Sequence, residues 1–87
     1  MIVLLHKSLQ KRMPKYPKSL REKIKDRIKL FVKNPFDPIL NNHPLKGKLA
    51  EYRSINIGGD YRAIFFEPER GVAVFVDVGT HSKLYRS

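Results

Sequence analysis

The chain has 87 residues, of which 18 are Lys or Arg and 8 are Asp or Glu, so its formal net charge at pH 7 is +10. Its length allows one small domain over residues 1–87, and the absence of cysteine excludes disulfides and thiolate metal sites. The apolar run at residues 1–5 is far too short for a signal peptide or a membrane span, so we expect a soluble, cytoplasmic protein.

The excess of positive charge is the first indication of function. A sequence pI near 10.2 on so small a protein produces a strong positive potential, which attracts polyanions. The charge therefore favours nucleic acid or an acidic protein as the partner. The alternative is a charged surface that serves only solubility, and the size of the imbalance disfavours it.

The N-terminal segment is predicted to form a strand and a short helix. Residues 2–5 are apolar and suit a strand. Leu9 and Met13 lie four residues apart, as on one face of a helix. Pro14 ends this helix, because a proline in a helix interior lacks the N–H group that the helix needs.

The clearest helix in the sequence begins after Pro17. Ser19 and Glu22 have the spacing of a capping box, in which the serine side chain accepts from a free N–H and the glutamate reaches back to the cap. Asn34-Pro35 closes the helix. Its buried face is predicted to carry apolar side chains at helical spacing: Leu20, Ile24, Ile28 and Phe31.

Residues 35–47 are rich in Asn and Pro and are predicted to form a long connection, after which the period of the apolar pattern changes to two. Three strands are predicted, at residues 52–57, 61–66 and 72–78. Gly58-Gly59 is the predicted turn of the first hairpin, since both positions tolerate positive φ.

A second turn at residues 67–71 is predicted to join the last two strands. Gly79 ends the third strand, and residues 80–87 form a tail. This order indicates an α+β fold with a short N-terminal strand and two helices packed on an antiparallel three-stranded meander. The helices would cover one face of the sheet and leave the other partly open.

The predicted hairpin decides which side chains share a face of the sheet. With Gly58-Gly59 as the turn, Ile57 pairs with Asp60 and Ile55 pairs with Arg62. Continuing the register pairs Arg53 with Ile64. The two faces then carry different side chains: Arg53, Asp60 and Arg62 on one, and Tyr52, Asn56 and Tyr61 on the other.

Two histidines are the candidates for proton transfer. His43 lies near the end of the long connection, and His81 follows the third strand. Imidazole groups titrate near neutral pH, so one would take the proton of a ribose 2′-hydroxyl and the other would protonate the leaving 5′ oxygen. Asp60 would accept a proton or orient a histidine. The alternatives are surface or capping histidines, and an ion pair between Asp60 and Arg62.

Arg62 is the strongest single candidate for holding a phosphate. A guanidinium in mid-strand would clamp the phosphate with two parallel bonds and stabilise the charge of a pentavalent transition state, and Arg53 would assist it. Four further side chains would place the nucleic acid, two by phosphate contact and two by stacking on bases: Lys46, Lys48, Tyr61 and Tyr85. Core packing is an equal alternative for Tyr61. No metal or cofactor is predicted, since the histidines lack ligand spacing.

Three motifs in the second half of the chain carry a resemblance to a known family. They are His43-Pro44-Leu45-Lys46-Gly47, Asp60-Tyr61-Arg62-Ala63-Ile64-Phe65 and Gly79-Thr80-His81. In these motifs the chain resembles the RelE/ParE toxin superfamily, and most closely its YafQ-like branch. The resemblance implies an RNA-cleaving site at the matching positions: His43, Asp60, Tyr61, Arg62, His81 and Tyr85.

The resemblance also implies an activity and partners. The chain would be the toxin of a type II toxin–antitoxin pair, an endoribonuclease that cleaves messenger RNA in the ribosomal A site without a metal. The 2′-hydroxyl would be the nucleophile. The protein partner would be a cognate acidic antitoxin, laid across the basic groove.

The chain departs from the YafQ-like pattern at two positions, with Asn56 where the family has a histidine and Val78 where it has an arginine. Losing one transition-state donor commonly costs about 100- to 1000-fold in rate. Two alternatives therefore remain beside the nuclease. One is a ParE-like toxin that inhibits DNA gyrase without cutting RNA, although such proteins generally lack the Gly-Thr-His ending. The other is a catalytically impaired member that binds RNA or an antitoxin.

Overall fold

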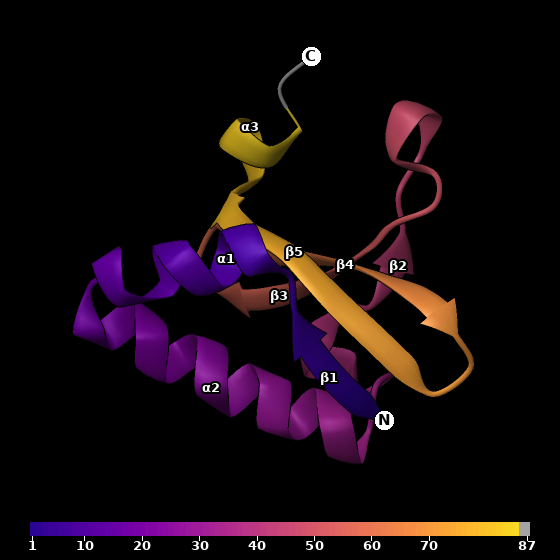
Figure 1. Cartoon of the computed structure of the whole chain (residues 1–87), viewed down its shortest axis with the longest axis horizontal. Helices are drawn as coiled ribbons and strands as arrows, with labels where there is room; N and C mark the ends of the chain where they lie inside the picture. Colours follow the sequence, from indigo (N-terminus) through magenta and orange to yellow (C-terminus); the bar gives the residue numbers. More distant parts are fainter. Residues whose placement is uncertain (86–87) are drawn as a thin grey trace.

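The computed structural model describes residues 1–85, and its centre is a five-stranded sheet with the order β1-β5-β4-β3-β2 (Figure 1). The strands are β1 (Ile2–Leu5), β2 (His43–Pro44), β3 (Arg53–Gly58), β4 (Tyr61–Glu69) and β5 (Val72–Thr80). β1 runs parallel to β5, and the other neighbouring pairs are antiparallel. The predicted α+β fold and its antiparallel meander are confirmed, while β2 lies inside the segment predicted as a connection.

Three α-helices accompany the sheet, namely α1 (Lys7–Arg12), α2 (Lys18–Lys33) and α3 (His81–Leu84). Three short 3-10 helices lie between them, namely η1 (Met13–Lys15), η2 (Pro38–Leu40) and η3 (Gly47–Leu49). The two predicted helices are confirmed. The predicted tail begins instead with α3, and its last two residues lie outside the described part of the chain. Within residues 1–85, no helix combines the length and the apolar character needed to cross a membrane.

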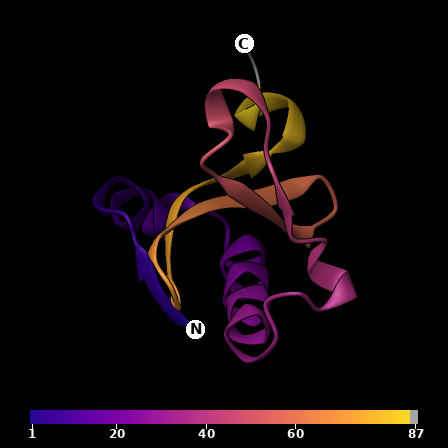
Figure 2. The same ribbon diagram turned by 90° about the vertical axis from the view of Figure 1, so that its right-hand side faces the viewer.

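The hydrophobic core lies between α2 and one face of the sheet. Phe31 of α2 is fully buried, and its ring packs edge-on against the rings of Phe65 and Phe75, with centroid distances of 4.9 and 5.4 Å. Leu20 and Ile24 are also buried, as their helical spacing predicts. In Figure 2, α2 lies on one side of the sheet, whereas α3 and the η3 segment rise on the other. The second side of the sheet is therefore available to carry a site.

The predicted capping box at the start of α2 is wrong. The N-cap residue is Pro17, which makes no side-chain capping bond, and Ser19 is already inside the helix. The first helical hydrogen bond runs from the Arg21 N–H to the Pro17 carbonyl at 3.0 Å. The proline carbonyl thus starts the helix two residues earlier than the serine hydroxyl would, and a proline at this end loses no helical bond because its N–H would be free anyway.

The first hairpin turn lies one residue later than predicted. Gly58 still belongs to β3 and pairs with Tyr61, so the turn consists of Gly59 and Asp60. Gly59 has a φ of 53°, in the left-handed region that glycine adopts without strain. A bulge between Asn56 and Gly58 absorbs the extra residue.

The shifted turn changes which side chains share a face. Arg62 pairs with Asn56, and Arg53 pairs with the core residue Phe65, so the predicted pairings of both arginines are wrong. Arg62 therefore lies on the same face as Asn56, opposite the core, while Arg53 lies on the core face. The predicted grouping of Arg53 with Arg62 fails because one bulged residue reverses the alternation.

The ends of the last two strands also differ from prediction. β4 extends to Glu69, which leaves only Arg70 and Gly71 in the second turn. β5 continues through Gly79 to Thr80, so Gly79 does not end it. The longer β5 carries the chain directly into α3, whose first residue is His81.

Candidate active site

Two histidines from distant parts of the sequence line one pocket. His43, Pro44, Leu45 and Lys46 form one wall, His81 and Tyr85 of the α3 segment form the other, and the pocket has a volume of about 270 Å³. We call it the histidine pocket. Two contacts explain the juxtaposition: β2 pairs with β3, which places His43 opposite Ser54, and the Tyr85 hydroxyl reaches the same Ser54 from the α3 segment.

His43 is held by a hydrogen bond that fixes the tautomer of its neutral ring. Its Nδ1 lies 2.7 Å from the carbonyl oxygen of Asn41. A carbonyl can only accept, so Nδ1 carries the proton, and in the neutral ring Nε2 holds the free lone pair. Asn41 has a φ of 46°, a left-handed backbone conformation that asparagine tolerates. In this state, Nε2 of His43 is equipped to accept a proton.

His81 is exposed and begins α3. Its backbone N–H donates to the Asp60 carbonyl at 3.0 Å, which ties the start of α3 to the first hairpin. Its ring packs edge-on against the ring of Tyr85, with a centroid distance of 4.5 Å. The hydroxyl of Tyr85 in turn donates to Ser54 Oγ at 2.9 Å. Ser54 is fully buried in β3, so these contacts connect His81 to the centre of the sheet.

Asp60 contacts the predicted site through its backbone. Its side chain is exposed in the hairpin turn, and the bond to His81 uses the Asp60 carbonyl rather than the carboxylate. The ion pair considered between Asp60 and Arg62 does not form. The ion pair found within residues 1–85 joins Arg12 to Asp77, at 2.7 Å. The backbone of Asp60 thus lies next to that of His81, but the Asp60 carboxylate does not orient the His81 ring.

Arg62 bends back over the hairpin. Its Nη1 lies 3.4 Å from the Gly59 carbonyl and 3.2 Å from the Tyr61 carbonyl, and Arg62 is not among the residues that line the histidine pocket. It does lie on the same face of the sheet as Ser54, two residues along the register. These bonds are long and bind neutral carbonyls, so a phosphate would compete well for the guanidinium.

Arg53 has a different environment from the one predicted. Its Nε donates to Asn42 Oδ1 at 2.8 Å, and its guanidinium lies 5.5 Å from the centre of the Phe36 ring. Both contacts secure the segment that follows α2. Since Arg53 projects toward the core face, the structure separates it from the histidine pocket.

Tyr61 lies in a second, larger pocket of about 480 Å³, formed between the α1–α2 turn and the end of β5. Tyr16 also lines this pocket, and its hydroxyl donates to the Val78 carbonyl at 3.2 Å. Burial raises the pKa of the Tyr16 phenol, and the Arg12 guanidinium partly offsets this effect. Tyr61 and the two histidines are therefore not brought together in one pocket.

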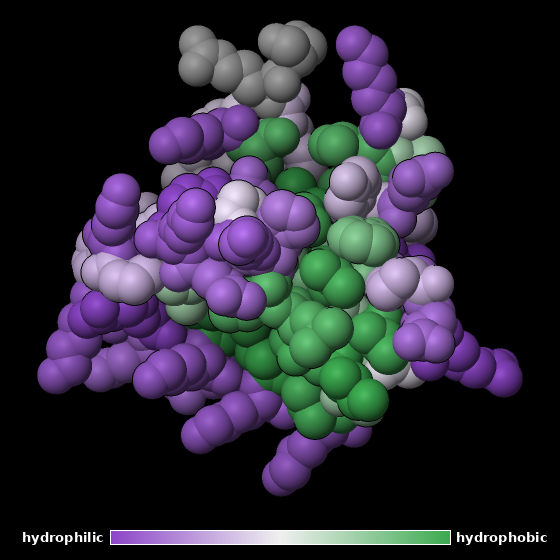
Figure 3. All heavy atoms as spheres, in the orientation of Figure 1, coloured by the Kyte–Doolittle hydropathy of each residue, from purple (hydrophilic) through white to green (hydrophobic). Residues whose placement is uncertain are grey.

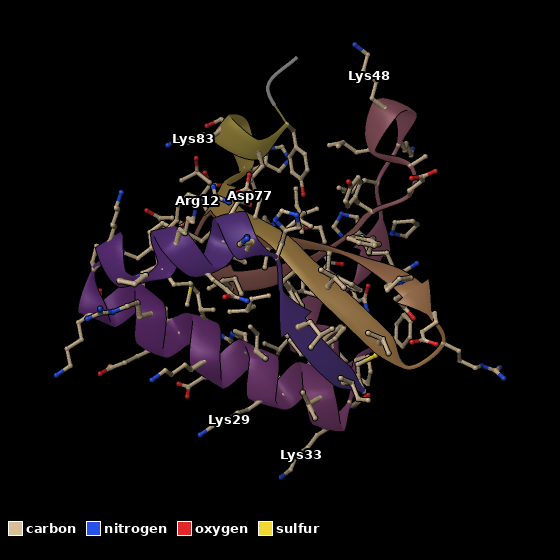
Figure 4. All side chains as sticks on the ribbon, in the orientation of Figure 1. Arg12, Lys29, Lys33, Lys48, Asp77 and Lys83 are labelled. Atoms are coloured by element: carbon tan, nitrogen blue, oxygen red, sulfur yellow. The ribbon has the colours of Figure 1, made fainter. Side chains whose placement is uncertain are left out.

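The two predicted lysines lie on the wall formed by residues 43–49. Lys46 lines the histidine pocket, and Lys48 extends from the tip of η3 into solvent (Figure 4). Together they make one rim of the pocket positive. The structure thus gathers four of the predicted residues at one place, His43, His81, Lys46 and Tyr85, with Lys48 beside them.

Sequence reasoning missed Ser54, and it singled out Asn56 only as a departure from the family pattern. Ser54 is the Cα partner of His43 and the hydrogen-bond partner of Tyr85. Asn56 is two residues further along β3, and its Oδ1 is buried without a hydrogen-bond partner within residues 1–85. The available signal was that Ser54 and Asn56 interrupt an otherwise apolar strand, since a polar residue buried in a sheet needs a specific partner.

The chain is similar to several proteins of known structure. No protein-family model and no curated protein matches the sequence. A YoeB/ParE toxin from Agrobacterium tumefaciens superposes with a TM-score of 0.72 at 22% identity, over 93% of this chain and 99% of that one. YafQ in the E. coli DinJ–YafQ complex gives 0.67 at 19% identity, over 95% and 96%. A copper-bound variant of a toxin from Helicobacter pylori gives 0.69 at 27% identity, over 98% and 99%.

The chain has the fold of the RelE/ParE toxins. The superposition spans nearly the whole of each chain, so it includes the elements that form the histidine pocket as well as the core. The predicted resemblance to this superfamily, which includes YafQ, is therefore confirmed at the level of the fold. Among the described residues, no group of three or more His, Cys, Asp or Glu side chains is arranged to hold a metal ion.

Proposed function

We propose that this chain is the toxin of a type II toxin–antitoxin system and that it cleaves messenger RNA in the ribosomal A site without a metal. The observation that carries the proposal is the histidine pocket, where His43 and His81 face a common space with Lys46 and Tyr85. Two imidazoles, a cation and an aromatic ring are the groups needed to transfer protons at a phosphodiester while holding it.

The arrangement supports a specific division of the proton transfers. His43 takes the proton of a ribose 2′-hydroxyl at Nε2, because its Nδ1 is already a donor to Asn41. The 2′ oxygen then forms a bond to phosphorus, and the bond from phosphorus to the 5′ oxygen breaks. His81, in its protonated form, donates a proton to that leaving oxygen. The products are a 2′,3′-cyclic phosphate and a 5′-hydroxyl end, and no outside reactant is consumed.

Four side chains would hold the RNA. Lys46 and Lys48 contact phosphates along the rim, and Tyr85 stacks on a base next to the scissile bond. Arg62 reaches the scissile phosphate by leaving its long bonds to the hairpin carbonyls. The protein acts in the cytoplasm, where ribosomes supply the substrate.

The protein partner in this proposal is an acidic antitoxin. YafQ has been solved in a complex with DinJ, and a YoeB toxin from Staphylococcus aureus in a complex with YefM. The net charge of +10 on this chain favours a partner of opposite charge. An antitoxin that covers the histidine pocket would block access to RNA.

The test is expression of the chain in bacteria without an antitoxin, combined with mapping of messenger RNA 5′ ends. The wild type is compared with His43→Ala, His81→Ala and, as a matched control, His6→Ala. His6 caps α1 through Ser8 and lies outside the histidine pocket. We expect growth arrest and new in-frame cuts for the wild type and the control, and loss of both in the two pocket variants.

Each other outcome has a defined meaning. Cleavage that persists in both pocket variants would refute the assigned proton transfers. Arrest with intact messenger RNA and a DNA damage response would indicate a gyrase-inhibiting toxin of the ParE type. Cleavage of free RNA by the purified protein would show that the ribosome is dispensable.

A catalytically impaired protein that binds RNA or an antitoxin is the second candidate. It is favoured by Asn56, which stands where the YafQ-like pattern has a histidine, and whose Oδ1 has no hydrogen-bond partner among residues 1–85. It is also favoured by the position of Arg62 outside the histidine pocket. This candidate predicts that the folded protein retards RNA in a binding assay and that its expression causes neither arrest nor cuts.

A further inference from the structure

The pocket that holds Tyr61 lies on the other side of α3 from the histidine pocket. Lys83 of α3 lines this larger pocket of about 480 Å³, whereas His81 and Tyr85 line the histidine pocket. Side chains two residues apart on a helix point roughly 200° apart, so Lys83 and His81 face opposite ways. We call the larger pocket the tyrosine pocket, because Tyr16 and Tyr61 both line it.

The tyrosine pocket has an apolar lining and hydrophilic surroundings. Its apolar side chains come from the start of α2, from β5 and from α3, and they are Pro17, Leu20, Val78 and Leu84. Figure 3 shows that the surface over α1, beside this pocket, is hydrophilic, whereas the hydrophobic surface of this view lies over β1 and the neighbouring part of β5. Small-molecule sites are typically pockets of about 300–1,000 Å³ with a mostly apolar lining and a few polar groups, which is the character of this pocket.

Three groups in the pocket are open to a ligand. Asp77 accepts from Arg12 and from the Val78 N–H, but both bonds use Oδ1, so within residues 1–85 its Oδ2 has no partner. Lys83 makes no ion pair within the same residues. The Tyr61 side chain is 37% exposed. The pocket therefore offers a carboxylate oxygen, an ammonium group and an aromatic ring.

These three groups specify the chemistry of the ligand. A carboxylate oxygen accepts a hydrogen bond from an amino group, and a tyrosine ring stacks on a planar base. A lysine ammonium binds a phosphate as a point charge, and the net charge of +10 attracts anions to the protein as a whole. A purine nucleoside monophosphate with an amino group on its base, such as AMP, has all three complementary groups.

The position of α3 depends on contacts that border the tyrosine pocket. Leu84 packs directly on the backbone of the buried Gly79, where an added methyl group would lie 3.3 Å from Leu84 Cδ2. Two hydrogen bonds add to this packing, from the His81 N–H to the first hairpin and from the Tyr85 hydroxyl to β3. A ligand that contacts both α3 and β5 binds best when α3 is in this position, so it stabilises this position.

We propose that the tyrosine pocket binds a purine nucleoside monophosphate and that the bound nucleotide holds α3, and with it His81, in place. The amino group of the base donates to Asp77 Oδ2, the base stacks on Tyr61, and the phosphate pairs with Lys83. The second half of the proposal rests on the proposed function, since it makes the nucleotide an activator of RNA cleavage. A nucleotide of the RNA substrate is a poor occupant, because α3 stands between this pocket and the histidine pocket.

The binding test compares four probes that differ in single groups. AMP has the amino group, the base and the phosphate. IMP lacks the amino group, adenosine lacks the phosphate, and ribose 5-phosphate lacks the base. Affinity for the full-length protein is measured by calorimetry, and the bound surface is mapped by NMR of the backbone amides. We expect AMP to bind with shifts at Gly79, Thr80 and Lys83, and the other probes to bind about tenfold or more weakly, as for loss of one charged or stacking contact.

Two variants test the phosphate and the base separately. Lys83→Gln is compared with Lys29→Gln, since both lysines are exposed and Lys29 lies on α2 at the opposite side of the molecule (Figure 4). We expect affinity for AMP to fall about tenfold or more in Lys83→Gln and to stay at the wild-type value in the control. Tyr61→Ala should weaken binding of AMP and leave that of ribose 5-phosphate unchanged. Tyr61→Leu replaces it if circular dichroism shows that Tyr61→Ala is unfolded.

The effect on α3 has a readout that needs no catalysis. The backbone N–H groups of His81 and Tyr85 donate to the carbonyls of Asp60 and His81, and both bonds break when α3 leaves its place. We expect saturating AMP to slow hydrogen exchange at these two amides in the wild type and to leave it unchanged in Lys83→Gln. RNA cleavage by the wild type should rise over the same range of AMP concentration.

Three binding results would overturn the nucleotide site. They are no binding of AMP at millimolar concentration, equal binding of AMP and ribose 5-phosphate, and amide shifts remote from the tyrosine pocket. A 2′-O-methyl RNA, which cannot be cleaved, might instead compete with AMP. If this RNA displaces AMP and gives the same shift at Lys83, the pocket belongs to the path of the RNA and the proposal is wrong.

The nucleotide proposal and the nuclease proposal fail separately. AMP binding with slowed exchange, in a protein that does not cleave RNA, would support the nucleotide site and refute the nuclease. RNA cleavage by a protein that does not bind AMP would refute the nucleotide site alone. Cleavage at a rate that saturating AMP leaves unchanged would refute the activating role of the nucleotide.

Discussion

The hydroxyl of Tyr85 donates a hydrogen bond to the hydroxyl of Ser54, at 2.9 Å, across the space between α3 and the centre of the sheet. Ser54 is fully buried and has an apolar neighbour at Ile55, so this bond satisfies a polar group that would otherwise be stranded. Because the Tyr85 ring also packs against His81, one tyrosine fixes both the helix and the imidazole.

Replacing Tyr85 with Phe keeps the ring and removes the bond to Ser54. We expect the free energy of unfolding to fall by about 1 kcal/mol, the usual net value of such a bond, and RNA cleavage to fall further than stability explains. The rate is measured at a temperature where both proteins are fully folded. Ser54→Ala, which removes the other partner, should reproduce the loss of rate, and an unchanged rate in both variants would show that the bond only holds the helix.

Arg62 and Arg53 offer a matched pair for testing phosphate binding. Arg62 lies on the open face and Arg53 on the core face. Arg62→Lys keeps the charge but cannot make two parallel bonds to a phosphate, so we expect the turnover rate to fall about 100-fold, as for loss of a transition-state donor.

In the control, Arg53→Lys should weaken folding through its contacts with Asn42 and Phe36 and leave turnover near that of the wild type. Single-turnover kinetics with excess enzyme separate turnover from binding. A larger loss of turnover in Arg53→Lys than in Arg62→Lys would contradict the proposal that the arginine on the open face binds the phosphate.

The Tyr16 phenol makes the stability of the folded protein depend on pH in the alkaline range. Burial raises the pKa of its phenol above the ordinary value of 10.0, so the folded state holds the proton more tightly than the unfolded state does. This contribution is complete below pH 10.0 and is lost as the pH rises through the raised pKa. Urea unfolding of the wild type from about pH 8 to about pH 11 should therefore show declining stability at the alkaline end.

The variant Tyr16→Phe lacks the titrating group and should show a shallower alkaline decline. It also loses the bond to the Val78 carbonyl, so it should be less stable at neutral pH by about 1 kcal/mol. Identical alkaline slopes in the two proteins would assign the decline to other groups.

Phe31 is the side chain on which the core depends most. Its ring contacts both Phe65 and Phe75, and all three are fully buried. Phe31→Ala should cost about 3–5 kcal/mol, a large part of the roughly 5–15 kcal/mol available to a small domain. We expect a lowered or absent thermal transition by circular dichroism, whereas Val32→Ala, next to it and partly exposed, should melt within a few degrees of the wild type.

The sequence was sufficient to predict the elements that rest on strong periodic patterns. The long helix follows from Leu20, Ile24 and Phe31, and the meander follows from alternating apolar residues, so both are confirmed. The edges of the sheet were harder, because β2 has only two residues and its existence depends on pairing with Ser54 and Arg53. A two-residue strand has no pattern of its own to detect.

The errors at the site arise from single-residue shifts. One bulge at Asn56–Gly58 moves the turn and reverses the faces assigned to Arg53 and Arg62. The meeting of His43 and His81 was proposed from their chemistry and the family resemblance, and only the structure shows them in a common pocket. The sequence does not indicate that Tyr61 lies in a different pocket from the two histidines, or that Ser54 binds Tyr85. Both features depend on how α3 lies over the sheet.

The parallel pairing of β1 with β5 has a consequence for synthesis of the protein. Ile2 pairs with Val72, so within residues 1–85 the first strand along the chain pairs with the last one. Contacts this distant in sequence form late and slow the folding reaction. The five-stranded sheet therefore cannot be completed until β5 has been made, and His81, which follows β5 directly, can reach the histidine pocket only then.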